Sequence, residues 1–409
     1  MQAVILAAGK GTRAWPLTQT RPKALLKVGN KTILEHNLKA LESLVDEIII
    51  VIGYLGKEIE NFFSNYAFKA FKDKIKLIYQ INSQKSNTAN TALALFSAKN
   101  ELKDRFLVIN GDDIYSKNDL ENLISKDYGV LIYENKNKEI NTSTTMDFFE
   151  NLDGKLVLAN SDFINTGAYA LTKDFFNYLD IELGLPGSIV KYSSKNSISV
   201  EKVKDFWIPI NYSWDLLRAN KFLLMNNMIP EYYKYYSQHG FKFENVFVGN
   251  NVLIDDVKFG LPDEHSCYAI IGDGSRIGPF ALIRSFTSIG DGCRIQEFCT
   301  IKNSILFDGA IVAHRAYVGD SIIGSNVNIS DGAACLNTRV DKDEVFVYLN
   351  GEKTNTGLKK FGAVIGDEAF IGGGVKLNPG TLVPAKAQVI YKKGEIVYRT
   401  SKKEEWKKL

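Results

Sequence analysis

The first half of the chain alternates short apolar runs with stretches of helical spacing. Apolar runs predict strands at residues 3–7, 47–52, 75–80, 105–109 and 129–133, and helical spacing predicts helices at 33–44 and 214–225. This βαβ alternation predicts an α/β, Rossmann-like domain whose mostly parallel sheet has helices on both faces. Ligands of such sheets bind beyond the carboxyl ends of the strands, so the residues after each strand are the first candidates for a site.

The second half carries a different pattern, in which a mostly aliphatic residue returns at every sixth position. The runs of this pattern are Ile271, Ile277, Ile283, Ile289, Ile295 and Ile301, then Ile305, Ile311, Tyr317, Ile323, Ile329 and Cys335, then Ile365, Ile371, Leu377, Val383 and Val389. A six-residue period predicts a left-handed parallel β-helix of hexapeptide repeats, with these side chains pointing inward. The polar segment 337–361 interrupts the period and is expected to project as a loop.

These two patterns divide the chain into domains. We expect the α/β domain at 1–228, a tyrosine-rich linker at 229–244, the β-helix at 245–400 and a basic tail at 401–409 that lies in a solvated helix. A chain of 409 residues exceeds one ordinary hydrophobic core, which agrees with two domains.

Composition restricts the partners and the location that we expect. A hydrophobic content of 45%, a charged content of 24% and a net charge of +3 are typical of a soluble globular protein and do not favour a nucleic-acid partner. No apolar run reaches about 20 residues and no charged leader precedes the first strand, so we expect no membrane partner and a cytoplasmic protein. The 4 cysteines form no CxxC pair, which argues against zinc and favours buried thiols.

A phosphate-binding pattern follows the first strand. Gly9 and Gly11 form a turn directly after it, and Arg13 and Lys23 come next in the sequence. Backbone N–H groups of a glycine turn can approach phosphate oxygens closely. The Arg13 guanidinium is suited to neutralising a departing pyrophosphate, and the Lys23 ammonium is suited to binding an α-phosphate.

Residues 6–23 resemble the signature of the sugar-1-phosphate nucleotidylyltransferases, and residues 108–112, 128–130 and 164–169 resemble further segments of that family. The resemblance implies transfer of a nucleotidyl group from a nucleoside triphosphate to a sugar 1-phosphate, with Arg13 and Lys23 catalytic and Asp112 holding Mg²⁺. It also implies nucleotide contacts by Leu6, Ala8, Gly9, Gly11, Thr12, Thr88 and Asp112, and sugar contacts by Gly129 and Asn165.

Three positions depart from the family pattern. The second metal ligand of the family falls at Pro209, which has no side-chain donor, and Asn211 is the nearby alternative. The base-contacting Gly-Thr pair of the family is Asn87 and Thr88 here, and its Glu-Lys-Pro element is absent around residues 160–162. These departures leave the predicted fold intact and leave open whether the nucleotidyl site is active.

A second candidate site lies in the β-helix at His314, because histidine is the residue type best suited to act as a general base near neutral pH. Residues 313–321 resemble the catalytic coil of the acetyltransferase domain in bifunctional UDP-N-acetylglucosamine pyrophosphorylase/glucosamine-1-phosphate N-acetyltransferases of the archaeal type. The resemblance implies acetyl-CoA as co-substrate and a homotrimer with acyl sites between subunits. It implies sugar contacts by Arg284, Lys302, Tyr317, Asn328 and Lys360, and an acetyl-CoA contact by Asn337.

Three functions stay open at this point. The first is a bifunctional enzyme that N-acetylates an amino-sugar 1-phosphate and then transfers a uridylyl group from UTP to the product. The second keeps only the acetyltransferase beside a degenerate nucleotidyltransferase domain, and the third is a non-catalytic regulatory subunit. The whole-chain resemblance favours UTP over dTTP, whereas glucosamine and galactosamine 1-phosphates, which differ at one hydroxyl, stay equivalent.

Overall fold

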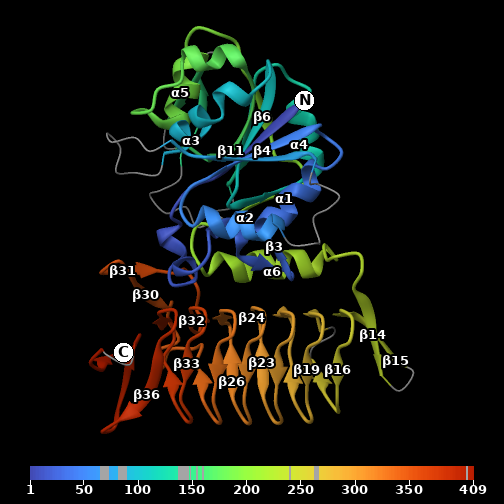
Figure 1. Cartoon of the computed structure of the whole chain (residues 1–409), viewed down its shortest axis with the longest axis vertical. Coiled ribbons are helices and arrows are strands. Elements are labelled where there is room, and N and C mark those ends of the chain that lie inside the picture. The colour runs from blue at the N-terminus through green and yellow to red at the C-terminus, as the bar shows by residue number, and fades with distance from the viewer. Residues whose placement is uncertain are drawn as a thin grey trace. The chain divides into compact units, whose positions relative to one another are not determined.

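The computed structural model describes residues 1–64, 73–81, 90–136, 147, 149–152, 155–158, 161–238, 241–261, 267–401 and 404–409. They form two compact units (Figure 1). The first unit comprises Met1–Gly11, Arg21–Leu25 and Ile33–Pro209, and the second comprises Thr12–Thr20, Leu26–Thr32 and Ile210–Leu409.

The first unit is built on a seven-stranded sheet with the order β12-β8-β11-β6-β1-β4-β5. Its strands are β1 Gln2–Ala7, β4 Glu47–Ile52, β5 Ile75–Tyr79, β6 Arg105–Asn110, β8 Gly129–Glu134, β11 Phe163–Thr172 and β12 Ser199–Lys202. All neighbours pair in parallel except β11, which is antiparallel to both β6 and β8. The predicted α/β sheet is therefore confirmed, and each strand expected from an apolar run is present.

Helices cover both faces of this sheet (Figure 1). On one face lie α1 Ile33–Leu41, α2 Gly56–Ser64 and α4 Lys117–Ile124, and on the other lie α3 Thr91–Ser97 and α5 Gly184–Ser193. Successive strand residues serve opposite faces, so that Ile5 packs with the first group of helices and Val4 with the second. Two small pairs complete the unit: β7 Asp113–Tyr115 with β13 Trp207–Pro209, and β9 Phe149–Leu152 with β10 Lys155–Leu158.

The second unit contains the predicted β-helix, whose short strands stack coil upon coil into three parallel faces (Figure 1). The eight-stranded face holds β14 Lys234–Gln238, β15 Phe241–Val248, β18 Ala269–Ile271, β21 Thr287–Ile289, β24 Ile305–Leu306, β27 Ile322–Ile323, β32 Val364–Ile365 and β35 Leu382–Val383. The nine-stranded face holds β16 Leu253–Ile254, β19 Arg276–Ile277, β22 Arg294–Ile295, β25 Ile311–Val312, β28 Asn328–Ile329, β33 Phe370–Ile371, β36 Gln388–Lys392, β37 Glu395–Arg399 and β38 Lys407–Lys408. The six-stranded face holds β17 Lys258–Phe259, β20 Leu282–Ile283, β23 Thr300–Lys302, β26 Tyr317–Gly319, β29 Ala334–Cys335 and β34 Lys376–Leu377.

The inward side chains follow the predicted period in the first and third runs, but not throughout the second. Ile289 pairs with Leu306, Ile295 with Val312 and Ile301 with Val318. Leu306, Val312 and Val318 therefore belong to the core instead of the expected Ile305, Ile311 and Tyr317. The coil is one residue shorter there, and the period returns to the expected phase at Ile323. As a result the Tyr317 ring faces outward, where it is available for chemistry.

Two segments differ from the prediction. The expected linker at 229–244 contains β14 and the start of β15, which pair as a hairpin and join the first coil through β18. The expected terminal helix is instead β38, which pairs antiparallel with β37 and places Trp406 against Arg399, with the guanidinium carbon 4.4 Å from the ring centroid. In both places edge pairing satisfies backbone groups that a helix or coil would otherwise have to satisfy. The predicted loop at 337–361 projects as expected and carries the hairpin β30 Phe346–Leu349 and β31 Glu352–Asn355.

Helix α6 Asp215–Met225 and the pair β2 Lys27–Val28 and β3 Lys31–Thr32 belong to the second unit. The buried Asn220 of α6 accepts the Gly29 N–H at 3.0 Å and the Ser288 hydroxyl at 2.6 Å. Its amide donates to the Phe286 carbonyl at 3.0 Å. One buried amide thus joins the helix and the N-terminal segment to the β-helix.

Candidate active sites

The carboxyl ends of β1 and β6 bring the predicted nucleotide-binding backbone to one edge of the sheet. The Leu6 carbonyl accepts the Gly111 N–H at 2.9 Å, and the Ala8 carbonyl accepts the Tyr54 N–H at 3.1 Å. A Cβ at Gly111 would lie 2.9 Å from the Leu6 carbonyl oxygen, so this close approach needs glycine. The edge is the one where ligands of α/β sheets bind.

The glycine turn continues from this edge into the second unit. Gly9 is exposed with open space around it, and Gly11 has a φ of 61°, a left-handed conformation that favours glycine. Thr12 is exposed and begins the 3₁₀ helix Thr12–Ala14. The predicted contact Thr88 lies outside the described residues.

Lys23 and Asp112 form an ion pair beside the same edge. The Lys23 Nζ lies 2.7 Å from Asp112 Oδ2, and Lys23 is buried whereas 41% of the Asp112 side chain is exposed. A fixed ammonium next to an accessible carboxylate is suited to a ligand that carries both phosphate oxygens and a metal ion.

The donors near Asp112 fit a magnesium ion that is held mainly by its substrate. The neighbouring Asp113 is buried in β7, where its backbone pairs with Pro209, and it leaves Asp112 as the accessible carboxylate. Mg²⁺ usually keeps several waters and takes one or two carboxylates plus substrate phosphates, so one aspartate suffices for this mode. Across the parts of the chain that the structure describes, there is no cluster of three or more His, Cys, Asp or Glu side chains.

The predicted sugar residues of this unit do not lie together. Asn165 lies at a β-bulge of β11, where its amide donates to the Tyr169 hydroxyl at 2.7 Å, and the adjoining Gly167 approaches Asn110 at the nucleotide edge. Gly129 instead begins β8, which is parallel to β6, so it lies at the opposite edge, with Leu123 against its Cα. A Cβ added at Gly129 would lie 2.8 Å from Leu123 Cδ1, so glycine leaves room for that side chain, and the sugar contact at Gly129 stays a prediction.

Arg13 lies over an aromatic stack of the second unit. Its guanidinium carbon is 5.6 Å from the centroid of the Tyr212 ring. The Tyr212 ring stacks on Trp214 at 4.3 Å, and Trp214 meets Phe361 of the β-helix edge to face at 6.1 Å. The arginine predicted to meet pyrophosphate is thus oriented by a cation–π contact that belongs to the β-helix unit.

The signature loop, residues Thr12–Thr20, is also hydrogen-bonded to the β-helix. The Ala385 N–H donates to Gln19 Oε1 at 2.8 Å, and the Thr20 hydroxyl donates to Asp367 Oδ2. These contacts explain why Thr12–Thr20 groups with the second unit.

The acyl-transfer candidates meet at two corners of the β-helix. At the corner between the nine-stranded and six-stranded faces, the Arg315 N–H donates to the Glu297 carbonyl at 3.0 Å and the Gly332 N–H to the His314 carbonyl at 2.9 Å. Glu297 and His314 therefore occupy the same position in successive coils. The His314 Nδ1 lies 2.8 Å from Glu297 Oε1, within ion-pair distance, although its angle is not that of a hydrogen bond.

The other end of the six-stranded face collects the predicted sugar-binding cations. Arg284 follows β20 and Lys302 ends β23, and the pairing of Ile283 with Ile301 sets these two side chains on neighbouring coils. Tyr317 begins β26, and burial together with Asp320 raises the pKa of its hydroxyl, while Arg284 and a hydrogen bond from Asn337 lower it. Arg284 and Asn337 therefore both lie close enough to Tyr317 to influence its hydroxyl.

Asn337 and Lys360 stand at the base of the projecting loop. The Phe361 N–H donates to the Asn337 carbonyl at 2.9 Å, and Thr338 forms a β-bridge with Lys360. Lys360 is exposed, and Asn337 is half-buried. These two backbone contacts join the ends of the loop, and they hold Asn337 and Lys360 close to the end of β29.

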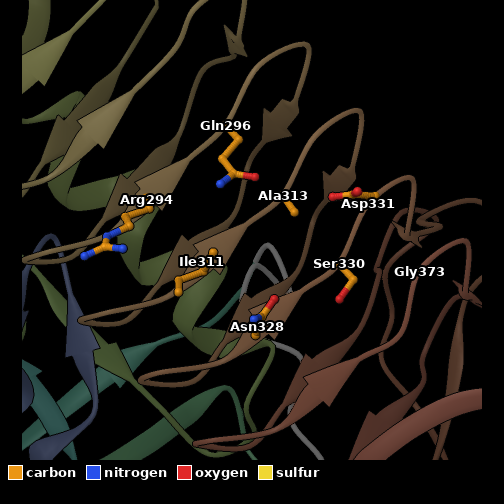
Figure 2. A pocket seen from close by; sticks show the side chains of 8 residues that line it. All are labelled: Arg294, Gln296, Ile311, Ala313, Asn328, Ser330, Asp331 and Gly373. Atoms are coloured by element: carbon orange, nitrogen blue, oxygen red, sulfur yellow. The ribbon is translucent and has the colours of Figure 1, made fainter.

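Asn328 lies elsewhere, in a groove of about 440 Å³ on the nine-stranded face (Figure 2). The groove is lined by Arg294, Gln296, Ile311, Ala313, Asn328, Ser330, Asp331 and Gly373. Figure 2 shows Arg294, Ile311 and Asn328 on successive strands, and the other labelled residues on the turns that follow the strands. A single chain therefore presents Asn328 on a different face from Arg284, Lys302 and Tyr317.

Two carboxylates of these corners were missed from the sequence: Glu297 beside His314, and Asp320 beside Lys302 and Asn337. Each lies one coil, or 17 residues, from a residue that was predicted. The coil length would have revealed both, but the assumed phase of the second run was shifted by one residue.

The fold and these sites define a nucleotidyl transferase domain joined to a β-helix with an acyltransferase-type corner. The Nucleotidyl transferase family matches residues 2–184, and the GMPPB C-terminal domain matches residues 266–396. The Bifunctional protein GlmU of Methanocaldococcus jannaschii is 31% identical, with 98% of this chain and 100% of the relative covered. The GlmU of Methanococcus aeolicus is 32% identical over 98% of this chain and 100% of its own.

A third relative is named Bifunctional sugar-1-phosphate nucleotidylyltransferase/acetyltransferase, from Sulfurisphaera tokodaii, and is 31% identical over 95% of this chain and 96% of its own. The chain belongs to this family of bifunctional GlmU-type transferases. The described residues include no helix long and apolar enough to cross a membrane.

Proposed function

We propose that this chain both N-acetylates an amino-sugar 1-phosphate with acetyl-CoA and transfers a uridylyl group from UTP to the N-acetylated product. The observation that carries the proposal is the stacking of Glu297 against His314 on the same β-helix whose adjoining face carries Arg284 and Lys302. A general base and a phosphate-binding pair are the two elements that an amino-sugar phosphate requires. We also propose that the protein acts in the cytoplasm.

The arrangement of these groups supports the following course of acyl transfer. The sugar nitrogen attacks the thioester carbonyl carbon while His314 takes a proton from it through its Nε2, and Glu297 stabilises the imidazolium through Nδ1. The carbon–sulfur bond breaks, and the sulfur leaves as a thiolate that receives a proton as coenzyme A. Arg284 and Lys302 hold the phosphate, and Asn337 faces the acetyl group.

Uridylyl transfer would use the nucleotide edge of the first unit. A phosphate oxygen of the sugar 1-phosphate attacks the α-phosphorus of UTP in line, and the bond to the β-phosphate breaks to release pyrophosphate. Lys23 neutralises charge at the α-phosphate, Arg13 neutralises the pyrophosphate, and the backbone from Leu6 to Gly11 cradles the nucleotide. A bound Mg²⁺, held by Asp112, would supply further neutralisation of the phosphates.

The acyl site is completed by a second copy of the chain in this proposal. Asn328 lies on the nine-stranded face, away from the face that bears Arg284 and Lys302. A neighbouring subunit that turns its nine-stranded face toward this cluster would bring Asn328 to the sugar. A closed ring of three such heterologous contacts gives the homotrimer.

One observation favours a second candidate function, an acetyltransferase whose nucleotidyl domain is degenerate. Pro209 pairs with Asp113, directly beside Asp112, at the place where the resemblance expects a second metal ligand. A proline there supplies no oxygen, so the metal would depend on Asp112 and substrate alone.

One assay separates these possibilities. Purified protein is given glucosamine 1-phosphate, acetyl-CoA, UTP and Mg²⁺, and both thiol release and pyrophosphate release are followed. The bifunctional proposal expects both products, with His314→Ala losing thiol release and retaining pyrophosphate release from N-acetylglucosamine 1-phosphate. Thiol without pyrophosphate would select the second candidate, and neither product with glucosamine or galactosamine 1-phosphate would refute the proposal.

A further inference from the structure

Asp320 is a buried carboxylate at the centre of the candidate acyl-transfer cluster. It is 4% exposed and has a φ of 48°, a left-handed conformation that aspartate tolerates better than most residues. Its Oδ1 accepts from the Asn303 amide at 2.7 Å, and its Oδ2 accepts from the Asn337 amide and lies 3.6 Å from the Lys302 Nζ. Three donors from two other coils thus converge on one carboxylate.

The backbone of Asp320 is fixed as firmly as its side chain. Its N–H donates to the Lys302 carbonyl at 2.9 Å, and its carbonyl accepts the Gly362 N–H at 2.8 Å. Asp320 therefore links the coil that bears Lys302 to the base of the projecting loop that bears Asn337. The carboxylate cannot move without disturbing both.

The chemistry of a carboxylate sets the orientation of its neighbours. An ionised carboxylate only accepts hydrogen bonds, so the Asn337 amide must turn its nitrogen toward Asp320. The Asn337 Oδ1 is then directed away, where Thr338 Oγ1 donates to it at 3.4 Å. The same negative charge also holds the ammonium of Lys302, whose side chain is only 19% exposed.

Resting on the proposed acetyl transfer, we infer that Asp320 is a positioning residue that acts through Lys302 and Asn337. It holds the ammonium of Lys302 for the sugar phosphate and fixes the Asn337 amide in one of its two orientations. The substrate meets these two side chains and not Asp320 itself, which is buried beneath them.

The test replaces Asp320 by asparagine, which keeps the shape and the left-handed backbone but presents an N–H₂ group to donors. We expect kcat/KM for acetyl transfer to fall about tenfold to hundredfold, as loss of hydrogen bonds to a charged group predicts. Loss through Lys302 raises KM for glucosamine 1-phosphate, whereas loss through Asn337 lowers kcat. The matched control, Asp273→Asn, removes a corner carboxylate that accepts the Asn250 N–H at 2.8 Å away from this cluster, and should leave acetyl transfer within about twofold.

A double-mutant cycle separates positioning from general stabilisation. If Asp320 acts through its two neighbours, D320N should no longer raise KM for glucosamine 1-phosphate in a Lys302→Ala background and should no longer lower kcat in an Asn337→Ala background. Additive losses in both Lys302→Ala and Asn337→Ala backgrounds would overturn the inference, as would wild-type acetyl transfer by D320N. Unchanged thermal unfolding shows that D320N folds, and the milder Asn303→Ala, which removes one donor, replaces it if it does not.

Assays of the wild-type protein distinguish a failure of the proposed acetyl transfer from a failure of the role of Asp320. Absence of thiol release from wild type would refute the proposed acetyl transfer. Normal thiol release from wild type and from D320N alike would refute only the role of Asp320.

Discussion

At the scale of single residues, Glu297 lies beside His314 and is the carboxylate partner that the proposed acyl transfer uses. Replacing Glu297 by glutamine keeps the size of the side chain but removes the charge that lies 2.8 Å from Nδ1. The imidazolium formed in acyl transfer loses its stabilising partner, so we expect kcat for thiol release to fall about tenfold to hundredfold. Pyrophosphate release by the same preparation should not change. Equal loss of both activities would show that Glu297 supports the fold instead.

Pro209 offers a second test at this scale, because it pairs in register with Asp113, the residue that follows Asp112. Pro209→Asp restores a carboxylate at that position and should raise the rate of pyrophosphate release about tenfold at limiting Mg²⁺. Pro209→Ala is the matched control, since it restores the backbone N–H without adding an oxygen. A rate that rises equally in both variants would assign the effect to the backbone.

Candidate site residues could be predicted from the sequence where they belong to a local motif. They could not be predicted where their contacts come from a neighbouring coil. His314, Arg284 and Lys302 could each be singled out from the sequence of their own coil. Glu297 and Asp320 acquire their roles only from the neighbours one coil away, which no local pattern shows.

At the scale of elements, the signature loop depends on the aromatic stack of the β-helix unit. Tyr212→Ala removes the ring that lies under Arg13, and we expect kcat/KM for uridylyl transfer to fall about tenfold, within the range of a cation–π contact. Tyr212→Phe keeps the ring and should retain activity within about twofold. Pyrophosphate release checks both, and similar losses in the two variants would exclude the ring as the cause.

The buried thiols of the β-helix give an element-scale prediction for pH. Burial raises the pKa of Cys293 to about 12, of Cys299 to about 11 and of Cys335 to about 12. A thiol in the unfolded chain has a pKa of about 8.5, so the folded state holds these protons more tightly than the unfolded chain does. The resulting contribution to the free energy of unfolding is fully present below that pH and is lost as pH rises toward the pKa values of the folded thiols. We expect the unfolding temperature to drop between about pH 8 and about pH 10, and to drop less in Cys335→Ala than in wild type.

A variant of the half-buried Cys267 provides the control for that experiment. Cys267→Ala should keep the wild-type dependence on pH, because its thiol is not fully buried. Identical pH slopes in Cys335→Ala and wild type would contradict the assignment to the buried thiol.

Elements could be predicted from periodicity as far as the period was undisturbed. The apolar runs gave the sheet of the first unit, and the six-residue repeat gave the β-helix. The shortened coil at Leu306, the hairpin β14–β15 and the terminal strand β38 could not be predicted, because each depends on pairing with a distant strand.

At the scale of the whole molecule, the predicted sugar-binding residues lie on two different faces of the β-helix, and we therefore expect acyl sites that two subunits share. If a neighbouring subunit supplies Asn328 to a site that uses His314, Arg284 and Lys302 of one chain, then His314→Ala and Asn328→Ala are each inactive in acyl transfer but complement each other. Co-expressing the two variants at equal levels with different tags should restore about one quarter of wild-type thiol release, the fraction that random assembly of threefold rings gives. Mixing the separately purified variants without subunit exchange is the control and should give none. Light scattering would report the trimer, and a doubly tagged, trimeric but inactive preparation would show that each chain forms its acyl site alone.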